Sequence, residues 1–579
     1  MDPVQLELKH QLGSWSPLIT VWAAYVAIVV GLFVRGRGPI TLDPRTWAVR
    51  IGDSLERLTR IPGWAAAMVG TATFGLLVAG IGFYSDVRWH VSLGRDDVLF
   101  TAPHTMIVIG LATILGAAFI GEFFATATKA KLEGGGLRIL GMRIPRSALA
   151  MGIIGFCAMS GFPMDELWHR AYGIDVTMWS PTHLLMICGA VISPLASWMA
   201  LGEAGVRPES GAWATGVHVA VGSFALLGLN ALQGEFAFGV PQFQQLYHPV
   251  MYALAAGFAL TAITLVTRWW PAPLIVAGVG VMLFISDSFT SATSSQPRAA
   301  SLYIVAGIAV AIVGRVFGTE RRGRFAVASG IAVGTVGLAA EWWWSQGSHQ
   351  PWNASLLPEA PILAVIVGVA AGTLGVAFAA AIRREPIGLQ GPVLAVAGLA
   401  ILAGLAIPLP RTGLDARADL TVTNASKGEV SVTAKVTPAD AADDAHWFQL
   451  LAWQGGGLES ADMVPTGTPG EYRSEHAVPA HDDWKTTLRL HRGASMVAIP
   501  VWMPADPEID APQVSAVDKS EPFLTEQRYL LREQNGVNGS AWFAIGVYLV
   551  LAAIAAMWVL ALVFTGRSIT RDIGVAAPA

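Results

Sequence analysis

Long apolar segments separated by short polar connections make up most of the chain. Each segment holds enough apolar residues to cross about 30 Å of hydrocarbon as a helix. The pattern therefore predicts an all-α polytopic membrane protein with about 13 transmembrane helices arranged as repeated hairpins. The predicted spans are residues 15–34, 61–84, 102–128, 147–164, 181–202, 212–233, 248–267, 270–286, 299–317, 324–343, 358–381, 389–409 and 541–565.

The pattern changes between the last two of these segments. Short runs there alternate apolar and polar residues, and turn-forming residues such as Gly455 and Pro469 separate the runs. Alternation with a period of two is typical of strands that bury one face. We expect a small β-sandwich over residues 410–535, with strands at 420–423, 429–436, 447–453, 486–490 and 496–502.

Lysine and arginine residues gather in alternate connections and again after the last span. Because positively charged loops stay in the cytoplasm, we expect a multi-pass protein of the cell membrane with its N-terminus outside and its C-terminus cytoplasmic. The β-sandwich is then extracytoplasmic. A hydrophobic content of 53%, a charged content of 13% and a net charge of −4 fit a lipid-bilayer environment and do not point to a nucleic-acid partner. The basic connections are residues 35–60, 129–146, 321–324 and 383–384.

One motif occurs twice in the first hairpins. Residues 86–104 and 165–183 share the pattern D-x-x-W-H-x-x-x-G-x-D-x7-H without a gap, and the second copy follows the first by 79 residues. The chain has only 12 histidines, so this repetition indicates a duplicated site rather than coincidence. The domains we expect are an N-terminal span with a basic loop (1–60), the duplicated hairpins (61–205), further hairpins (206–409), the β-sandwich (410–535) and a C-terminal span with its tail (536–579).

Each copy of the motif supplies the donors of a metal site. An aspartate and a histidine four residues apart lie on one helix face, one turn apart. Gly94 and Pro103 interrupt the helix, so the second histidine begins the next one and returns to the same level. Two imidazoles and one carboxylate suit copper, zinc or non-haem iron and leave a coordination position open. The predicted ligands are Asp86, His90, His104, Asp165, His169 and His183, supported by Asp96, Asp175, Trp89 and Trp168 around them.

Other interpretations of these residues stay open. A single copy of the motif also fits an interfacial belt of tryptophan with solvated acids, and it is the duplication that favours metal. Two histidines 14 residues apart also occur in haem-binding b-type cytochromes, but those need one unbroken helix. Glu235 and His248 form a candidate third site, and the lone His218 within an apolar span is interpreted as a hydrogen-bonded core residue.

The duplicated D-x3-H pair with a second histidine 14 residues further on resembles the membrane copper sites of the particulate methane/ammonia monooxygenase family, in its C-type subunit. The resemblance covers residues 86–183. It implies a copper cofactor that activates O2, a small apolar or reduced-nitrogen substrate, electrons from a quinol or another donor, and other membrane subunits as partners in an oligomer or complex. The extracytoplasmic β domain resembles the B-type subunit more loosely, and the chain has no His-x-His with which that subunit binds copper.

Three classes of function are consistent with the sequence. The first is a copper-dependent membrane monooxygenase, the second is a protein for metal binding, transport or oxidase assembly, and the third is a non-metallic scaffold. A metal carrier should show ligands that step through the membrane, whereas the predicted ligands lie at one level. We therefore expect a fixed metal site and an oxidoreductase.

Overall fold

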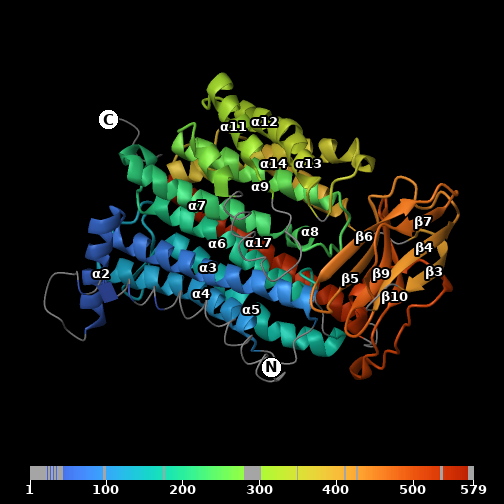
Figure 1. Ribbon diagram of the computed structural model, residues 1–579. Coiled ribbons are helices and arrows are strands. Elements are labelled where there is room, and N and C mark those ends of the chain that lie inside the picture. The colour runs from blue at the N-terminus through green and yellow to red at the C-terminus, as the bar shows by residue number, and fades with distance from the viewer. Residues whose placement is uncertain are drawn as a thin grey trace.

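The computed structural model describes residues 43–94, 100–173, 177–279, 301–348, 350–409, 413–424, 428–534 and 539–571, together with residues 23, 27, 30, 31 and 34. Long helices lie alongside one another, and a sheet domain lies at one end of them (Figure 1). This division agrees with the predicted helical and β regions.

Within the described residues, nine helices are long and apolar enough to cross a membrane. Two shorter apolar helices, α11 (Ile304–Phe317) and α15 (Gly391–Ala406), coincide with predicted spans. The predicted span 15–34 and the end of the predicted span 270–286 fall largely outside the described residues, so the number 13 stays a prediction. The nine are α3 (Gly63–Ser92), α4 (Ala102–Ala127), α5 (Arg146–Tyr172), α6 (Pro181–Glu203), α7 (Ala212–Ala231), α9 (Tyr247–Thr267), the continuous segment Arg322–Ser345 that contains α12 (Arg322–Ala332) and α13 (Leu338–Ser345), α14 (Glu359–Arg383) and α17 (Ala541–Arg571).

Small residues allow the helices of the two motif-bearing hairpins to approach each other closely. A Cβ atom added to Gly110 of α4 would lie 2.5 Å from the backbone nitrogen of Ala79 in α3. A Cβ atom added to Gly189 of α6 would likewise lie 2.4 Å from the Cβ of Ala158 in α5. Small residues at helix contacts are typical of membrane bundles, where backbone packing replaces the hydrophobic effect. Each hairpin is therefore held together along its length, below the motif residues.

The second helix of each hairpin begins in the same way. The hydroxyl of Thr101 caps the N-terminus of α4 by accepting from the His104 N–H, and Ser180 does the same for α6 and His183, each at 3.4 Å. A hydroxyl that accepts from the third helical N–H is a common way to begin a helix. Pro103 and Pro181 fit the first turn, because backbone N–H groups there have no partner within the helix and proline lacks only such a group. The capping places both histidines at the third position of their helices.

The rising helices continue beyond their predicted ends at residues 84 and 164. Helix α3 extends to Ser92 and α5 to Tyr172. Hydropathy falls at the polar motif residues, but backbone hydrogen bonding does not depend on hydropathy, so the helices run on for about two turns. Those added turns carry Asp86 and His90 in α3 and Asp165 and His169 in α5.

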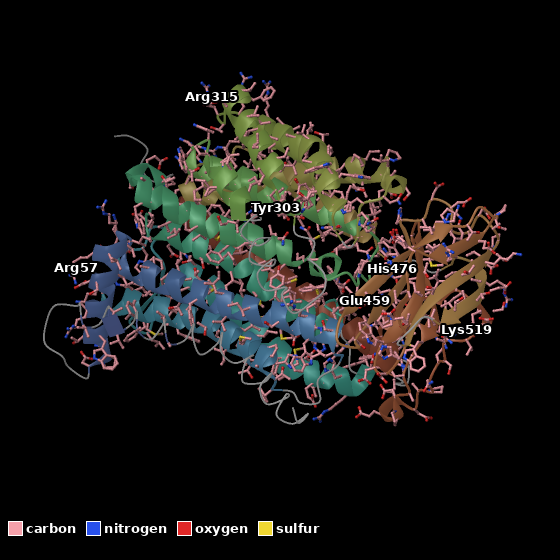
Figure 2. The ribbon with its side chains drawn as sticks, in the orientation of Figure 1. Arg57, Tyr303, Arg315, Glu459, His476 and Lys519 are labelled. Atoms are coloured by element: carbon pink, nitrogen blue, oxygen red, sulfur yellow. The ribbon has the colours of Figure 1, made fainter. Side chains whose placement is uncertain are left out.

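Basic loops meet at the end of the helices that lies away from the sheet domain. Arg268 pairs with Glu385 at 2.8 Å, and Arg384 pairs with Glu133 from the loop after α4. Arg57 and Arg315 also lie away from the sheet domain, which carries Glu459, His476 and Lys519 (Figure 2). Exposed ion pairs contribute little to stability, but these show that several of the basic connections share one end, as the alternation of charge predicts.

The sheet domain is a single antiparallel path of strands in the order β11-β3-β4-β7-β6-β5-β9-β10-β12, with β8 beside β4. Its two halves enclose a common core that includes Leu420, Val432, Leu450, Leu488 and Ile499. All five predicted strands are present, whereas β6 and the short strands β7, β8, β11 and β12 were not predicted. The strands are β3 (Arg417–Asn424), β4 (Glu429–Thr437), β5 (Trp447–Trp453), β6 (Leu458–Pro465), β7 (Glu471–Ser474), β8 (Val478–Pro479), β9 (Lys485–Arg492), β10 (Ser495–Trp502), β11 (Lys519–Pro522) and β12 (Leu524–Thr525).

The sheet domain is bonded directly to the helical part. The Gln245 N–H donates to Nε2 of His491 in β9 at 3.1 Å, and Arg489 donates to the Pro241 carbonyl at 3.3 Å. Burial lowers the pKa of His491 well below its usual value, so this imidazole is neutral and accepts that bond. The side chains of His491 and Arg489 are fully buried at this interface. The two parts therefore form one continuous structure through polar groups that water does not reach.

Candidate metal centres

The first centre joins the last turns of α3 to the first turn of α4. Asp86 and His90 are one turn apart on α3, and their Oδ2 and Nε2 atoms are 3.6 Å apart. The other carboxylate oxygen of Asp86 lies 3.1 Å from Nε2 of His104. The two imidazole rings lie 6.1 Å apart between centroids. One carboxylate thus faces two imidazole nitrogens, as the sequence spacing predicts.

The second centre repeats this arrangement between α5 and α6. Asp165 Oδ2 lies 3.7 Å from Nε2 of His169, and Oδ1 lies 3.4 Å from Nε2 of His183. The ring centroids are again 6.1 Å apart. In each centre, the three donor atoms lie within 4.8 Å of one another. Within the described residues, three or more metal-capable side chains come together in these two clusters.

The separations of the donor atoms fit a shared ion. Two atoms that each lie about 2.0–2.1 Å from one metal in a tetrahedral arrangement are about 3.3 Å apart. The carboxylate-to-imidazole separations in the two centres are 3.1, 3.6, 3.4 and 3.7 Å, which bracket that value. The side chains remain between 11% and 22% exposed, so the centres are partly open to their surroundings.

Backbone carbonyls orient one imidazole in each centre. Nδ1 of His90 donates to the Gly94 carbonyl at 3.0 Å, and Nδ1 of His183 donates to the Thr177 carbonyl. A carbonyl can only accept, so Nδ1 carries the proton and Nε2 of a neutral ring presents a lone pair. A lone pair that faces a carboxylate requires a positive charge between them, either a metal ion or a further proton. Histidine ligands of metals commonly have this outer hydrogen bond.

The predicted orienting acids, Asp96 and Asp175, lie outside the described residues. Within the described residues, the carbonyls of Gly94 and Thr177 orient the rings of His90 and His183. Gly94 has a φ of +96°, a backbone conformation that favours glycine, and this brings its carbonyl back to the His90 ring. The predicted neighbours Trp89 and Trp168 directly precede His90 and His169 in the sequence. Trp168 is buried and packs against Tyr172 and against Tyr548 of α17.

The hydroxyl of Thr182 distinguishes the second centre. It donates to Asp165 Oδ1 at 2.5 Å, and Asp165 is only 8% exposed. The corresponding position in the first centre is Pro103, which has no hydroxyl. Sequence reasoning missed Thr182, although a hydroxyl residue directly before a helix-starting histidine is a visible signal. It also missed the capping roles of Thr101 and Ser180.

The two centres are neighbours. The ring of Phe162 in α5, one turn before Asp165, packs edge-on against His104 of the first centre with centroids 6.4 Å apart. His183 of the second centre is also close enough to Asp86 to interact with it electrostatically. The two centres are therefore close enough to interact electrostatically.

Glu235 and His248, the candidate third site, each have hydrogen-bond partners elsewhere. Glu235 accepts from the Gln242 N–H at 2.8 Å and contacts the Thr177 hydroxyl at 3.4 Å, and its burial raises its pKa to about 8. His248 accepts from Trp352 Nε1 at 3.0 Å. Burial thus favours the neutral form of Glu235, which contacts Thr177 beside the second centre, and a third site formed by Glu235 and His248 stays a prediction.

The interpretation of His218 is confirmed. Its Nδ1 accepts from Trp198 Nε1 at 2.9 Å, and its Nε2 bonds to the Val206 carbonyl at 3.1 Å. The residue is fully buried. With both ring nitrogens engaged, His218 connects two helices in the core.

The chain matches no protein-family model, no curated protein and no solved structure. The class that the fold and the site define is thus a helical protein with several helices able to span a membrane, a C-terminal antiparallel sheet domain and two potential Asp/His/His metal centres. The resemblance to the copper monooxygenase family stays an expectation drawn from the motif.

Proposed function

We propose that this protein is a membrane metalloprotein that holds one transition-metal ion in each of its two Asp/His/His centres. The observation that carries the proposal is the convergence, twice, of two imidazole Nε2 atoms on one carboxylate at separations that fit a shared ion. The outer hydrogen bonds of His90 and His183 support it, because they direct Nε2 towards the carboxylate. Polar groups in a membrane helix are costly unless they are paired or bind a ligand.

The proposed orientation places both centres at the extracytoplasmic face of a cell membrane, with the N-terminus outside and the C-terminus cytoplasmic. The gathering of basic loops at the end away from the sheet domain supports this orientation. The first centre lies at a helix end that meets the sheet domain, because the β5–β6 turn bonds to the end of α3, and the second centre is its neighbour. Metal ions then reach the centres from outside the cell.

Copper is the metal that we propose first. A site of nitrogen and oxygen donors binds Cu²⁺ more tightly than the other first-row divalent ions, and zinc and iron are the alternatives. Three protein ligands leave a position open for water, O2 or substrate. We propose an oxygenase-like reaction in which one atom of O2 enters a small apolar or reduced-nitrogen substrate. The other atom leaves as water, with two electrons from a quinol or another donor and two protons.

Metal handling is the second candidate function. The partial exposure of the ligands favours it, because a protein that passes metal to a partner must let the ion in and out. The arrangement of all six ligands at the ends of their helices favours a fixed site instead. Oxygen consumption by copper-loaded membranes supplied with a quinol distinguishes the two, since a metal carrier consumes no oxygen beyond the rate of metal-free membranes.

Metal analysis of the purified protein tests the proposal. After loading with Cu²⁺ and removal of loosely bound ions, the wild-type protein should retain two equivalents. His90→Ala and His169→Ala should each retain one, and the double variant none. His476→Ala is the matched control, because this histidine is exposed on the sheet domain and should leave both equivalents in place. A wild-type protein without stoichiometric metal, or unchanged content in both single variants, would refute the proposal.

A further inference from the structure

The turn between β5 and β6 binds the end of the helix that carries the first centre. The side-chain amide of Gln454 donates to the His90 carbonyl at 3.0 Å, and the Gln454 backbone N–H donates to the Val91 carbonyl at 3.0 Å. The Gly456 N–H donates to the Ser92 carbonyl at 2.8 Å. Three consecutive carbonyls of α3 thus each receive a donor from the sheet domain, across 364 residues of sequence in the case of Gln454 and His90.

These are the carbonyls that a helix leaves unsatisfied at its end. The last four C=O groups of an α-helix have no partner within it. The α3 cap supplies one bond, from the Leu93 N–H to the Trp89 carbonyl at 2.7 Å. The next three carbonyls are those of His90, Val91 and Ser92, and the β5–β6 turn serves all three. The sheet domain therefore completes the helix turn that presents His90.

The turn has a backbone shaped for this contact. Gln454 has a φ of +69°, a left-handed conformation that is uncommon for a residue with a side chain, and it is only 6% exposed. At Gly455, an added Cβ would lie 2.1 Å from the Trp484 ring, so a side chain has no room there. Non-glycine residues in such conformations are retained where the surrounding structure holds them, often at functional sites.

Gln454 is also next to the group that orients the His90 ring. The Cβ position of Gly94 lies 3.7 Å from the side-chain amide carbon of Gln454, and the Gly94 carbonyl receives the His90 Nδ1–H. Gln454 therefore touches both ends of the short segment from His90 to Gly94. The end of α5 at the second centre is capped by other groups. The Gly173 N–H donates to the His169 carbonyl at 2.8 Å, and the Tyr172 hydroxyl donates to the Ser540 carbonyl at 2.6 Å.

We propose that Gln454 is a positioning residue for the first metal centre, and that docking of the sheet domain holds His90 in its metal-binding position. The proposal rests on the proposed function, because it assigns a role at that same centre. It makes the first centre depend on the sheet domain and leaves the second centre independent of the β5–β6 turn. Loss of the amide releases the last turn of α3, so the His90 ring samples orientations that do not bind metal.

The test measures the two centres separately. The His169→Ala background retains only the first centre, and the His90→Ala background retains only the second. Gln454→Gly accepts the positive φ and keeps the backbone N–H but removes the side-chain amide, and Gln454→Glu keeps the shape but replaces the donor with an acceptor. Gln513→Glu is the control, an exposed glutamine elsewhere on the sheet domain. Cu²⁺ affinity is measured by competition with a chelator, and the Cu²⁺ environment by electron paramagnetic resonance.

Both Gln454 variants should weaken Cu²⁺ binding at the first centre by about tenfold or more, which is typical for groups that support a metal ligand. They should alter its resonance spectrum while leaving the second centre and the Gln513→Glu protein unchanged. Equal weakening of both centres would show general destabilisation and overturn the proposal, as would unchanged binding at the first centre. A wild-type protein that binds no copper would overturn the proposed function as well, which separates that failure from a failure of the Gln454 proposal alone.

Discussion

The first and second centres share their donors and spacing but differ in what surrounds them. Both have an aspartate and a histidine one turn apart and a second histidine at the third position of the next helix. In the second centre, the Thr182 hydroxyl holds the carboxylate and a carbonyl holds His183. In the first centre, the position equivalent to Thr182 is Pro103, and the carbonyl bond is made by His90 rather than by the second histidine. The β5–β6 turn also bonds to the end of α3. The two copies of the motif thus share their Asp/His/His donors and differ in the groups that support them.

The difference indicates that two copies of one motif can hold metal with unequal strength. The Asp165 carboxylate is more buried than that of Asp86 and has one more hydrogen-bond donor from within its own hairpin. A charge-assisted hydrogen bond fixes a carboxylate in one orientation and is stronger than a neutral one. We therefore expect the second centre to bind metal more tightly than the first.

The largest expected effect comes from removing the carboxylates. Asp86→Asn should abolish metal binding at the first centre, and Asp165→Asn should abolish it at the second, because a neutral amide is a weak ligand and no longer balances the charge of the ion. Each variant should retain one equivalent by elemental analysis. Loss of both equivalents from either variant would mean that the two centres form one unit, since His183 lies within electrostatic reach of Asp86.

The second effect concerns Glu235, which contacts Thr177 beside the second centre. Burial raises its pKa to about 8 from 4.5, so the folded protein keeps the proton while the unfolded chain loses it above pH 4.5. The stability that this group contributes is fully present below pH 4.5 and is lost as pH rises to about 8. The loss is on the order of a few kcal/mol.

Glu235→Gln removes that pH dependence. Thermal unfolding of the metal-free protein between pH 5 and pH 8 should show a melting temperature that falls with pH for the wild type and less steeply for the variant. Glu475→Gln is the control, because this glutamate is exposed on the sheet domain and should leave the slope unchanged. Parallel curves for wild type and Glu235→Gln would contradict the raised pKa.

A smaller effect is expected from Thr182→Val, which keeps the shape of the side chain and removes its hydroxyl. Metal affinity at the second centre should fall by about tenfold, the lower end of the range for groups that hold a metal ligand. Thr182→Ser should restore most of it, because serine supplies the same donor. Titration of Cu²⁺ in the His90→Ala background isolates this centre, and affinity that is equal in all three proteins would rule out a role for the hydroxyl.

The smallest effect, and one of opposite sign, is expected from Pro103→Thr. This substitution gives the first centre the residue that the second centre has at the same helix position. The new hydroxyl can donate to Asp86, so Cu²⁺ affinity in the His169→Ala background should rise severalfold, on the order of 1 kcal/mol. A fall in affinity would show that the proline matters more for the start of α4 than the hydroxyl does for the carboxylate.

The sequence was informative where a structural feature depends on nearby residues. The spacing of Asp86, His90 and His104 was enough to predict that these three side chains come together, because it follows from one helix turn and one hairpin. The strands at 447–453 and 496–502 were predicted from alternation alone and are present as β5 and β10. Local periodicity also identified most of the helices, although it ended α3 and α5 too early where polar ligands interrupt the apolar run.

Features that depend on distant segments were not predictable in this way. Nothing near Gln454 indicates that it bonds to His90, because the contact depends on how the sheet domain docks. The raised pKa of Glu235 likewise follows from burial by several elements. The short strands β8 and β12 have two residues each, too few for a periodic pattern, and form only because longer strands offer them an edge.

The hydrogen bonds from the β5–β6 turn to α3 also set an order of events during biosynthesis. A ribosome adds roughly 5–20 residues per second, so residue 454 follows residue 90 by on the order of half a minute. Throughout that interval, Asp165, His169 and His183 have hydrogen-bond partners within residues 165–183, whereas the carbonyls of His90, Val91 and Ser92 await a turn that has yet to be made. A nascent chain therefore finishes its two copies of one motif at different times.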